Sequence, residues 1–206
     1  MIENRKDFIS TYWKYYCILE DDFVNLIKYV DLRENNYDTT SNVIIKQLQS
    51  TCSEFENISK EIIESDKKNK NIGIVDIYKG LNEGIDEILE ELKVIKIQDV
   101  HINVRQTKDL IIYPFKDWNE KEPGKLFWWD NYNKIKHSRV ENYQSGNFKS
   151  LLYSLGALYF LERVLVRKVY YRTREMDIPD KQSELFYIEH FGLKWSLDDE
   201  IKNKEG

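Results

Sequence analysis

Cysteine, proline, glycine and histidine are all scarce in this sequence. Its 206 residues include 2 Cys, 3 Pro, 8 Gly and 3 His. We expect Cys17 and Cys52 to lie on the apolar faces of two helices as buried free thiols, with a single disulfide as the alternative. Two cysteines with no nearby histidine do not make a zinc site. With so few proline and glycine residues to form turns, an all-β fold is disfavoured and long helices are expected.

The sequence also lacks a hydrophobic run long enough to span a bilayer. Its most apolar stretch, residues 151–161, is shorter than the roughly 20 residues that a spanning helix needs. The N-terminal residues, MIENRKDF, are charged and contain no apolar signal core. We therefore expect a cytoplasmic protein with no membrane partner.

Several common catalytic motifs are missing as well. There is no glycine-rich phosphate loop, no Gly-x-Ser-x-Gly elbow and no His-Glu-x-x-His pair. A di-metal carboxylate bundle needs Glu three residues before His, and the three histidines are instead preceded at that distance by Gln98, Lys134 and Tyr187. We expect no cofactor and no metal, a strand-surface role for His101, and a packing or capping role for His190.

What is present is helical periodicity. Apolar residues recur at three- and four-residue spacing over about 7–30, 42–64 and 74–92, which predicts three helices. Thr40 or Ser41 is the expected N-cap of the second helix. In the third, Gly80 and Gly84 each lower stability by up to roughly 1 kcal/mol relative to alanine and permit a close neighbour.

A further helix is expected over residues 148–174. Between Leu151 and Leu161 it is apolar nearly all round, which is typical of a helix buried among other helices. Gly146 is expected to stop the preceding helix, and Asn147 to cap this one. This buried helix is the centre of the predicted fold.

Between the helical segments, the periodicity changes to that of strands. Short β-branched runs at 94–97, 100–104 and 110–113 predict a small β-hairpin or three-stranded flap. The predicted fold is therefore mainly α: an antiparallel bundle of four to five long helices with a β insertion at about 94–113. We assign the bundle to residues 1–180 and a short amphipathic segment with a loose tail to residues 181–206.

The charge of the chain is unevenly distributed. The net charge is -5, which argues against a general nucleic-acid binder. From Lys125 to Glu175, however, ten Lys or Arg stand against four acidic residues, so this segment carries +6 and the remainder -11. The segment either forms a local anion site or pairs with acidic neighbours.

The candidate site lies in a short helix that we expect over residues 128–139. Asn133 and His137 are four residues apart, so they project from one helical face. His137 can exchange a proton near neutral pH, Asn133 can orient its imidazole, and Lys136 and Arg139 can stabilise a phosphate. Alternatively, Asn133 and His137 are a hydrogen-bonded structural pair.

Two faces of this helix are apolar. At about 100° per residue, one sector is expected to face the core, and it holds Trp128, Tyr132, Ile135, Tyr143 and also Arg139. A second flank holds Trp129, Asn133, His137 and Val140. A second semi-apolar flank is a candidate surface for a partner, and a homodimer contact is the natural expectation.

Four stretches carry a family resemblance: YWKYYCILEDDFVNLIKYVDL, LQSTCSEFENISKE, PFKDW and WWDNYNKIKHSR. They resemble bacterial helical proteins of the HEPN superfamily, most specifically in the block W-x-x-YN-x-x-KH-x-R. The resemblance covers most of the chain up to about Met176. It implies an antiparallel helical bundle, often a homodimer in which this helix from both subunits lines a shared cleft. Catalytic members are metal-independent ribonucleases of toxin–antitoxin, abortive-infection and CRISPR-linked systems.

Catalytic members carry an arginine, then four to six intervening residues, then the histidine, commonly with a polar residue after the arginine. Here, residues 129–133 occupy those positions without an arginine; Asn133 can fill the polar role, and Arg139 lies downstream. Three interpretations remain open. The chain is a HEPN-like ribonuclease that acts on RNA and has a cognate antitoxin, a non-catalytic HEPN-like dimerisation or partner-binding module, or a small-anion sensor using residues 125–174.

Overall fold

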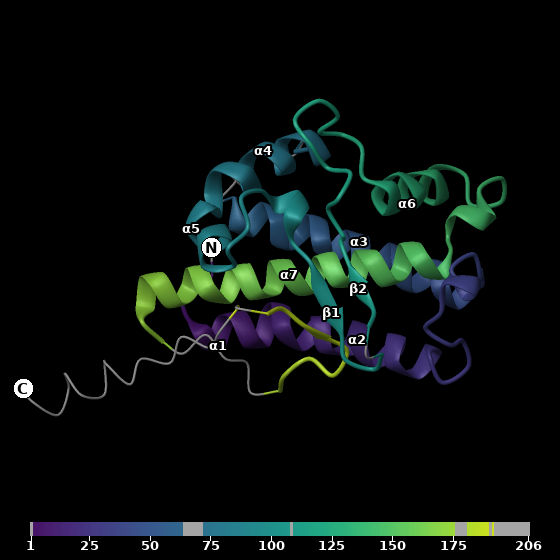
Figure 1. Cartoon of the computed structure of the whole chain (residues 1–206), viewed down its shortest axis with the longest axis horizontal. Coiled ribbons are helices and arrows are strands. Elements are labelled where there is room, and N and C mark those ends of the chain that lie inside the picture. The colour runs from purple at the N-terminus through teal and green to yellow at the C-terminus, as the bar shows by residue number, and fades with distance from the viewer. Residues whose placement is uncertain (1, 64–71, 108, 176–180, 190, 192–206) are drawn as a thin grey trace, which may run out of the picture.

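A single long helix, α7, forms the centre of the molecule. The computed structural model describes residues 2–63, 72–107, 109–175, 181–189 and 191. α7 runs from Phe148 to Thr173, and the other elements pack around it (Figure 1). Most of its residues are buried, which confirms the expectation of a helix enclosed by its neighbours. Within the described residues, no helix is both long and apolar enough to cross a membrane.

The N-terminal helix is continuous but contains one wider turn. It consists of α1 (Arg5–Phe8), the π-helical turn η1 (Ile9–Trp13) and α2 (Lys14–Leu26). Asn4 caps its start, with its side-chain oxygen accepting from the amide of Asp7 at 3.0 Å. The helix ends at Leu26 rather than near residue 30, because the amides of Lys28 and Tyr29 bond three residues back in a tighter turn.

α3 (Asn42–Ile62) begins where the sequence predicts, with the hydroxyl of Ser41 accepting from the amide of Ile44 at 3.2 Å. It lies beside α7 and runs in the same direction (Figure 1). A bridge between Thr40 and Asn147 joins their N-terminal ends, and Lys168 donates to the carbonyl of Ile62 at 2.8 Å near their C-terminal ends. The expected antiparallel arrangement therefore holds for the N-terminal helix but not for α3 and α7.

The third predicted helix is broken into α4 (Ile74–Gly84) and α5 (Asp86–Glu91). The break lies at Ile85, whose backbone is non-helical with φ -130° and ψ 13°. Gly80 permits the close approach that the sequence indicated, since a Cβ there would lie 2.8 Å from the side chain of Ile63.

The β-structure is a three-stranded antiparallel sheet in the order β2-β1-β3. Its strands are β1 (Ile102–Val104), β2 (Ile111–Ile112) and β3 (Phe186–Tyr187). β1 and β2 confirm the predicted hairpin, but the strand expected at 94–97 is wrong. Ile95 there is 88% exposed and has no sheet to pack on, and the 3-10 turn η3 (Ile97–Asp99) follows. The third strand comes instead from the segment expected to be amphipathic, and the boundary proposed at residue 180 stays a prediction.

Glu20 holds the segment before β3 against α2. Its carboxylate is fully buried and accepts hydrogen bonds from the hydroxyl of Tyr16 at 2.7 Å and from the amides of Glu184 and Leu185 at 3.0 and 3.2 Å. The hydroxyl of Ser183 donates to it as well. With four donors, the buried carboxylate has its hydrogen-bonding capacity filled. This network therefore links α2 to the segment before β3.

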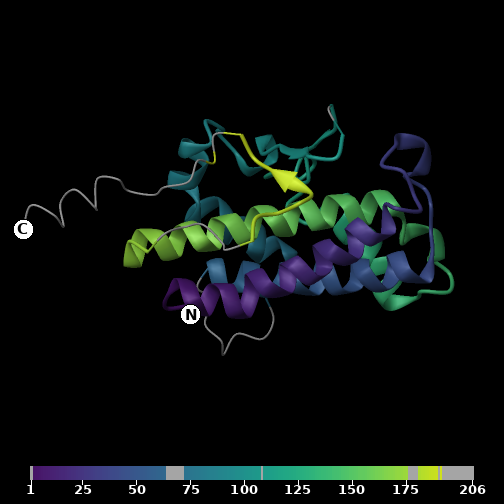
Figure 2. The same ribbon diagram turned by 90° about the horizontal axis from the view of Figure 1, so that it is seen from below.

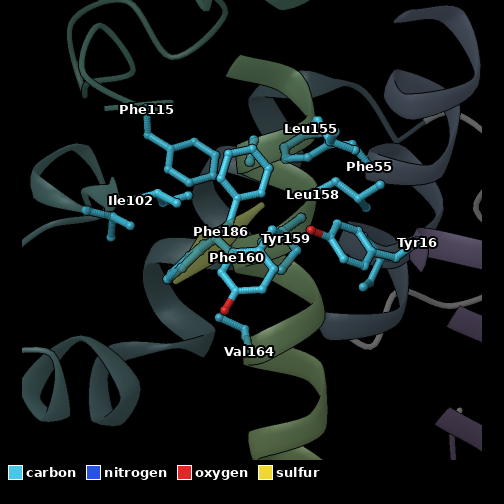
Figure 3. Close-up of a cluster of buried hydrophobic side chains, with 14 of the residues drawn as sticks. Tyr16, Phe55, Ile102, Phe115, Leu155, Leu158, Tyr159, Phe160, Val164 and Phe186 are labelled. Carbon is cyan, nitrogen blue, oxygen red and sulfur yellow. The ribbon is translucent and has the colours of Figure 1, made fainter. Parts of the chain in front are cut away.

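One face of α7 supports the sheet and another supports the N-terminal helix (Figure 3). Phe160 packs edge-on against Phe115 with ring centroids 5.5 Å apart, and Tyr159 lies 5.7 Å from Phe186. At Gly156, an added Cβ would lie only 2.6 Å from the Cδ1 atom of Ile112. The sheet therefore approaches α7 closely at this glycine. Figure 2 shows β3 above α7 and the N-terminal helix below it.

The two cysteines are both free, with Cys52 buried and Cys17 half-buried. The interpretation as two thiols is therefore confirmed over the disulfide alternative. Burial raises the pKa of the Cys17 thiol to about 11, which leaves it as the neutral, weakly reactive form.

Candidate functional site

The predicted site lies at the C-terminal end of α6, which spans Phe127–His137. The helix ends two residues earlier than expected because Ser138 leaves helical geometry, with φ -151° and ψ 83°. Asn142 stabilises this end by donating to the carbonyls of Lys134 and Ser138 at 3.3 and 2.9 Å. Residues after 137 therefore cannot be placed by extending the helical wheel.

The core-facing sector of α6 is as predicted up to that point. Trp128, Tyr132 and Ile135 are buried, and the indole of Trp128 donates to the carbonyl of Pro114 at 2.9 Å. Tyr143, which was assigned to the same sector, is instead in the short 3-10 turn η4 (Tyr143–Ser145). Arg139 was assigned there too, but it is exposed because it follows the end of the helix.

The second flank is only partly open. Trp129 is only 6% exposed, and its ring lies 5.9 Å from Phe55 and 5.1 Å from Tyr132. It belongs to the aromatic core between α3 and α6, so Trp129 itself is not available for a partner, and the homodimer contact through this flank stays a prediction. Val140 is 84% exposed, but it lies beyond the helix.

The structure places the four predicted site residues near one end of α6 without bonding them to one another. His137 is exposed and has no hydrogen-bond or ion-pair partner among the described residues. Asn133 is half-buried and makes no hydrogen bond to His137, so the structural-pair interpretation has no support. Arg139 donates to the side-chain oxygen of Asn42 on α3 at 3.3 Å, and the ammonium of Lys136 lies 5.5 Å from the ring of Tyr132.

The charge at this helix end is positive. Lys134, Lys136, His137 and Arg139 are all exposed there. The last turn of a helix carries partial negative charge on its unpaired carbonyls, so the ammonium groups of Lys134 and Lys136 also stabilise α6 by about 0.3–1 kcal/mol each. The four predicted site residues line neither of two surface hollows, one of about 470 Å³ between α2 and α3 and one of about 410 Å³ where α4 meets α5.

The cations of α7 do not join this group, because they make contacts at other points along the helix. The ion pair of Arg167 is with Glu91, and Arg172 donates to the carbonyl of Ile2 at 2.9 Å. The ammonium of Lys149 lies 5.4 to 5.7 Å from three aromatic ring centres, those of Phe127, Tyr37 and Tyr153. The basic segment 125–174 is therefore divided among several structural contacts and does not form one anion site.

Two carboxyl groups, Glu54 on α3 and Glu162 on α7, are buried close enough for the charge of Glu54 to affect Glu162. Glu162 is fully buried in the middle of α7, and neither of its carboxylate oxygens has a hydrogen-bond partner. Burial, and secondarily the charge of Glu54, raises the pKa of Glu162 well above its usual range. Glu54 on α3 is 8% exposed, and burial raises its pKa too, against the effect of a 3.2 Å hydrogen bond from Asn57.

Tyr12, in the π-helical turn η1, is close enough for the charges of both carboxyl groups to affect its pKa. Burial raises the pKa of Tyr12 to about 12, and the charges of Glu61, Glu54 and Glu162 add to the effect. A π-helical turn and an unsatisfied buried acid are each features that occur preferentially at functional sites. A single Glu inside an apolar run was the signal in the sequence that could have revealed the pair.

His101 is half-buried just before β1, with its ring 5.9 Å from that of Tyr113, and His190 lies outside the described residues. Among the described residues, no three His, Cys, Asp or Glu side chains are grouped as metal ligands would be. Comparisons of the chain with protein-family models, with curated proteins and with solved structures found no match.

Proposed function

We propose that this protein is a HEPN-like, metal-independent endoribonuclease whose reactive group is His137 at the end of α6. The observation that carries the proposal is the exposed imidazole, which has no protein partner among the described residues and lies in a cluster of exposed cations. Structural histidines normally use at least one ring nitrogen in a protein hydrogen bond. An exposed imidazole without a protein partner is available for proton transfer to and from a bound substrate.

The chemistry that suits these groups is transfer of a phosphodiester to the neighbouring ribose hydroxyl. The imidazole of His137 takes the proton of the 2′-hydroxyl as its oxygen bonds to phosphorus. The bond from phosphorus to the 5′ oxygen then breaks, and that oxygen takes a proton from a solvent water, leaving a 2′,3′-cyclic phosphate and a 5′-hydroxyl. His137 returns its proton to the solvent. Arg139 and Lys136 stabilise the charge on the non-bridging oxygens, and Asn133, one helical turn before His137, donates to the bound anion.

The proposal includes the wider properties that the family resemblance implies. They are a HEPN-type bundle, a homodimer, an RNA target, a cognate antitoxin or other protein partner, a role in a toxin or phage-defence system, and a cytoplasmic location. The mainly helical architecture supports the first of these, but the parallel direction of α3 and α7 is a specific feature that any HEPN alignment must accommodate.

Cleavage of RNA in the presence of a chelator tests the proposal directly. The purified protein is incubated with a labelled RNA in EDTA, and the products are examined for 2′,3′-cyclic phosphate ends. His137→Ala should lower the rate at least about a hundredfold, because a general acid–base group contributes factors of that order. His101→Ala is the matched control and should leave the rate unchanged, since that ring packs against Tyr113 away from α6. Absence of cleavage by the wild type, or equal cleavage by both variants, would refute the proposal.

A second candidate function is RNA or protein binding without catalysis. It is favoured by the fixed positions of the neighbouring cations, with Arg139 on Asn42 and Lys136 over Tyr132. Under this alternative, Lys136→Ala and Arg139→Ala weaken binding of a labelled RNA in a salt-dependent way, while His137→Ala binds as wild type and no RNA is cleaved.

A further inference from the structure

Three aromatic rings from separate parts of the chain surround the side-chain ammonium of Lys149 on α7. Its nitrogen lies over the rings of Tyr37, Phe127 and Tyr153, at 5.7, 5.4 and 5.7 Å from their centres. A cation within about 6 Å of a ring centre is attracted by the negative face of the ring. We call these three rings the aromatic cage, and its occupant in this structure is an ammonium group.

Backbone and ring contacts hold the aromatic cage in place without the lysine side chain. Tyr37 follows the 3-10 turn η2 (Glu34–Asn36), and its carbonyl accepts from the backbone amide of Lys149 at 3.1 Å. Phe127 is the first residue of α6, and its ring packs edge-on against that of Tyr153 with centroids 5.1 Å apart. All three rings are half-buried, so each keeps part of its surface open to solvent.

Negative charge lies close to the aromatic cage. Burial, the phenol of Tyr37 and then the charges of Glu34 and Asp117 raise the pKa of Tyr153 to about 12, so both carboxylates act on that ring. Glu34 and Asp117 are exposed, and neither carboxylate has an ion-pair partner within the described ranges. Uncompensated negative charge beside a binding site raises the local concentration of cations. The surroundings therefore favour a positively charged ligand.

The aromatic cage gives the ammonium of Lys149 ring faces but no hydrogen-bond acceptor. Among the described residues, this nitrogen has neither a hydrogen bond nor an ion pair. A lysine ammonium has three N–H donors and is strongly hydrated, so a place among ring faces removes part of its water. A quaternary ammonium carries the same charge without any N–H donor, and it therefore loses less hydration on entering the same space. The cage suits a quaternary ammonium better than the group it holds.

We propose that the aromatic cage binds a quaternary ammonium group, which enters as the side chain of Lys149 moves out into solvent. The methyl groups of the ligand contact the three ring faces, and Glu34 and Asp117 balance its charge. The flexible lysine side chain is half-buried, so it can leave the cage without movement of α7. The cage is at the opposite end of α6 from His137, so this site goes beyond the ribonuclease function and does not depend on it.

The test titrates the whole chain by calorimetry with choline and with its uncharged isostere, in which a tert-butyl group replaces the trimethylammonium group. Choline should bind at least about tenfold more tightly than the isostere, because attraction to the ring faces requires the charge. Phe127→Leu and Tyr153→Leu keep apolar bulk but remove a ring, and each should weaken choline binding at least about threefold. The matched control is Tyr113→Leu, which alters a 42% exposed tyrosine outside the cage and should leave binding unchanged. Circular dichroism confirms that each variant is folded.

Two further variants make the test specific for displacement of the lysine. Lys149→Ala opens the aromatic cage and should bind choline more tightly than the wild type, and Glu34→Gln, at an exposed position, should weaken binding without affecting the fold. A peptide carrying trimethyl-lysine is titrated in parallel, and the tighter ligand identifies whether the group arrives on a small molecule or on a protein.

The proposal is overturned if choline binds no more tightly than the isostere, if only Lys149→Ala binds it, or if loss of either ring has no effect. His137→Ala should bind choline as the wild type does. Failure of the ribonuclease proposal and failure of this one are therefore separate results.

Discussion

Replacing Glu162 with glutamine should stabilise the protein at neutral pH. The wild-type carboxyl group is fully buried on α7, with both oxygens unpartnered and Glu54 nearby. Its ionised form is therefore strongly disfavoured in the folded protein, whereas it ionises freely in the unfolded chain. Glu162→Gln keeps the size of the side chain and removes its ability to ionise.

The direction of the pH effect follows from the raised folded pKa. Below the ordinary carboxyl range, Glu162 is protonated in both states and has no effect on the free energy of unfolding. As the pH rises above that range, the unfolded chain loses the proton first, so stability falls by up to about 1.4 kcal/mol per pH unit until the folded group also ionises. The advantage of Glu162→Gln over wild type should grow over this interval and then level off.

The expected size at neutral pH comes from ionisation alone, up to about 1.4 kcal/mol for each pH unit above the ordinary carboxyl range, because the glutamine amide is as unpartnered as the protonated carboxyl group. That corresponds to a rise in Tm of roughly 2–4 °C for each kcal/mol in a protein of this size. The assay is urea unfolding at several pH values, followed by the fluorescence of the buried Trp118 and Trp128. Subtracting the free energy of unfolding of the wild type from that of the variant cancels the effects of most other titrating groups. Glu54 and Tyr12 are the exceptions, because they interact electrostatically with Glu162.

Glu83→Gln is the control, because Glu83 is exposed on α4 and should change stability by no more than about 0.5 kcal/mol at any pH. The reasoning is refuted if Glu162→Gln is no more stable than wild type at pH 8, or if the two have the same pH dependence. Either result would mean that the carboxyl group acquires a partner or water in solution.

Two further changes test the packing of the C-terminal strand and the sheet. Glu20→Ala removes the acceptor of Tyr16 and of the amides before β3, so it should lower the free energy of unfolding by about 3 kcal/mol or more and speed hydrogen exchange at Leu185; unchanged exchange would contradict the role of Glu20. Gly156→Ala places a Cβ against Ile112 and should destabilise by about 1–3 kcal/mol, while Ile112→Val removes the clashing atom and should relieve much of that loss in the double variant, as measured by urea unfolding.

The sequence predicted those features of the fold that depend on residues close together in the chain. α3 starts at a serine cap and α7 at an asparagine cap, and both caps are made by hydrogen bonds within three residues. The burial of α7 followed from its continuous apolar surface. The ends of α6 and of the N-terminal helix were less predictable. Apolar residues continue at helical spacing beyond His137 and Leu26, but the backbone turns away from helical geometry there.

Contacts between distant parts of the chain were not visible in the sequence. β3 pairs with β1 across more than 80 residues, with Tyr187 opposite Asn103, and no periodicity in a two-residue strand reveals that pairing. The same limit applies to Trp129, whose burial depends on Phe55 from α3. The candidate residues of α6 were found from residue type and spacing, but their exposure and their lack of mutual hydrogen bonds required coordinates.

The carboxylate of Glu20 has a consequence for how the chain reaches its native state. Its backbone donors, the amides of Glu184 and Leu185, lie more than 160 residues later in the chain. During synthesis, the carboxylate of Glu20 therefore lacks these partners until almost the whole polypeptide has been made. Truncations that end the chain before residue 183 would remove three of the four donors to this carboxylate. The protein therefore cannot be shortened to its helices alone without also neutralising position 20.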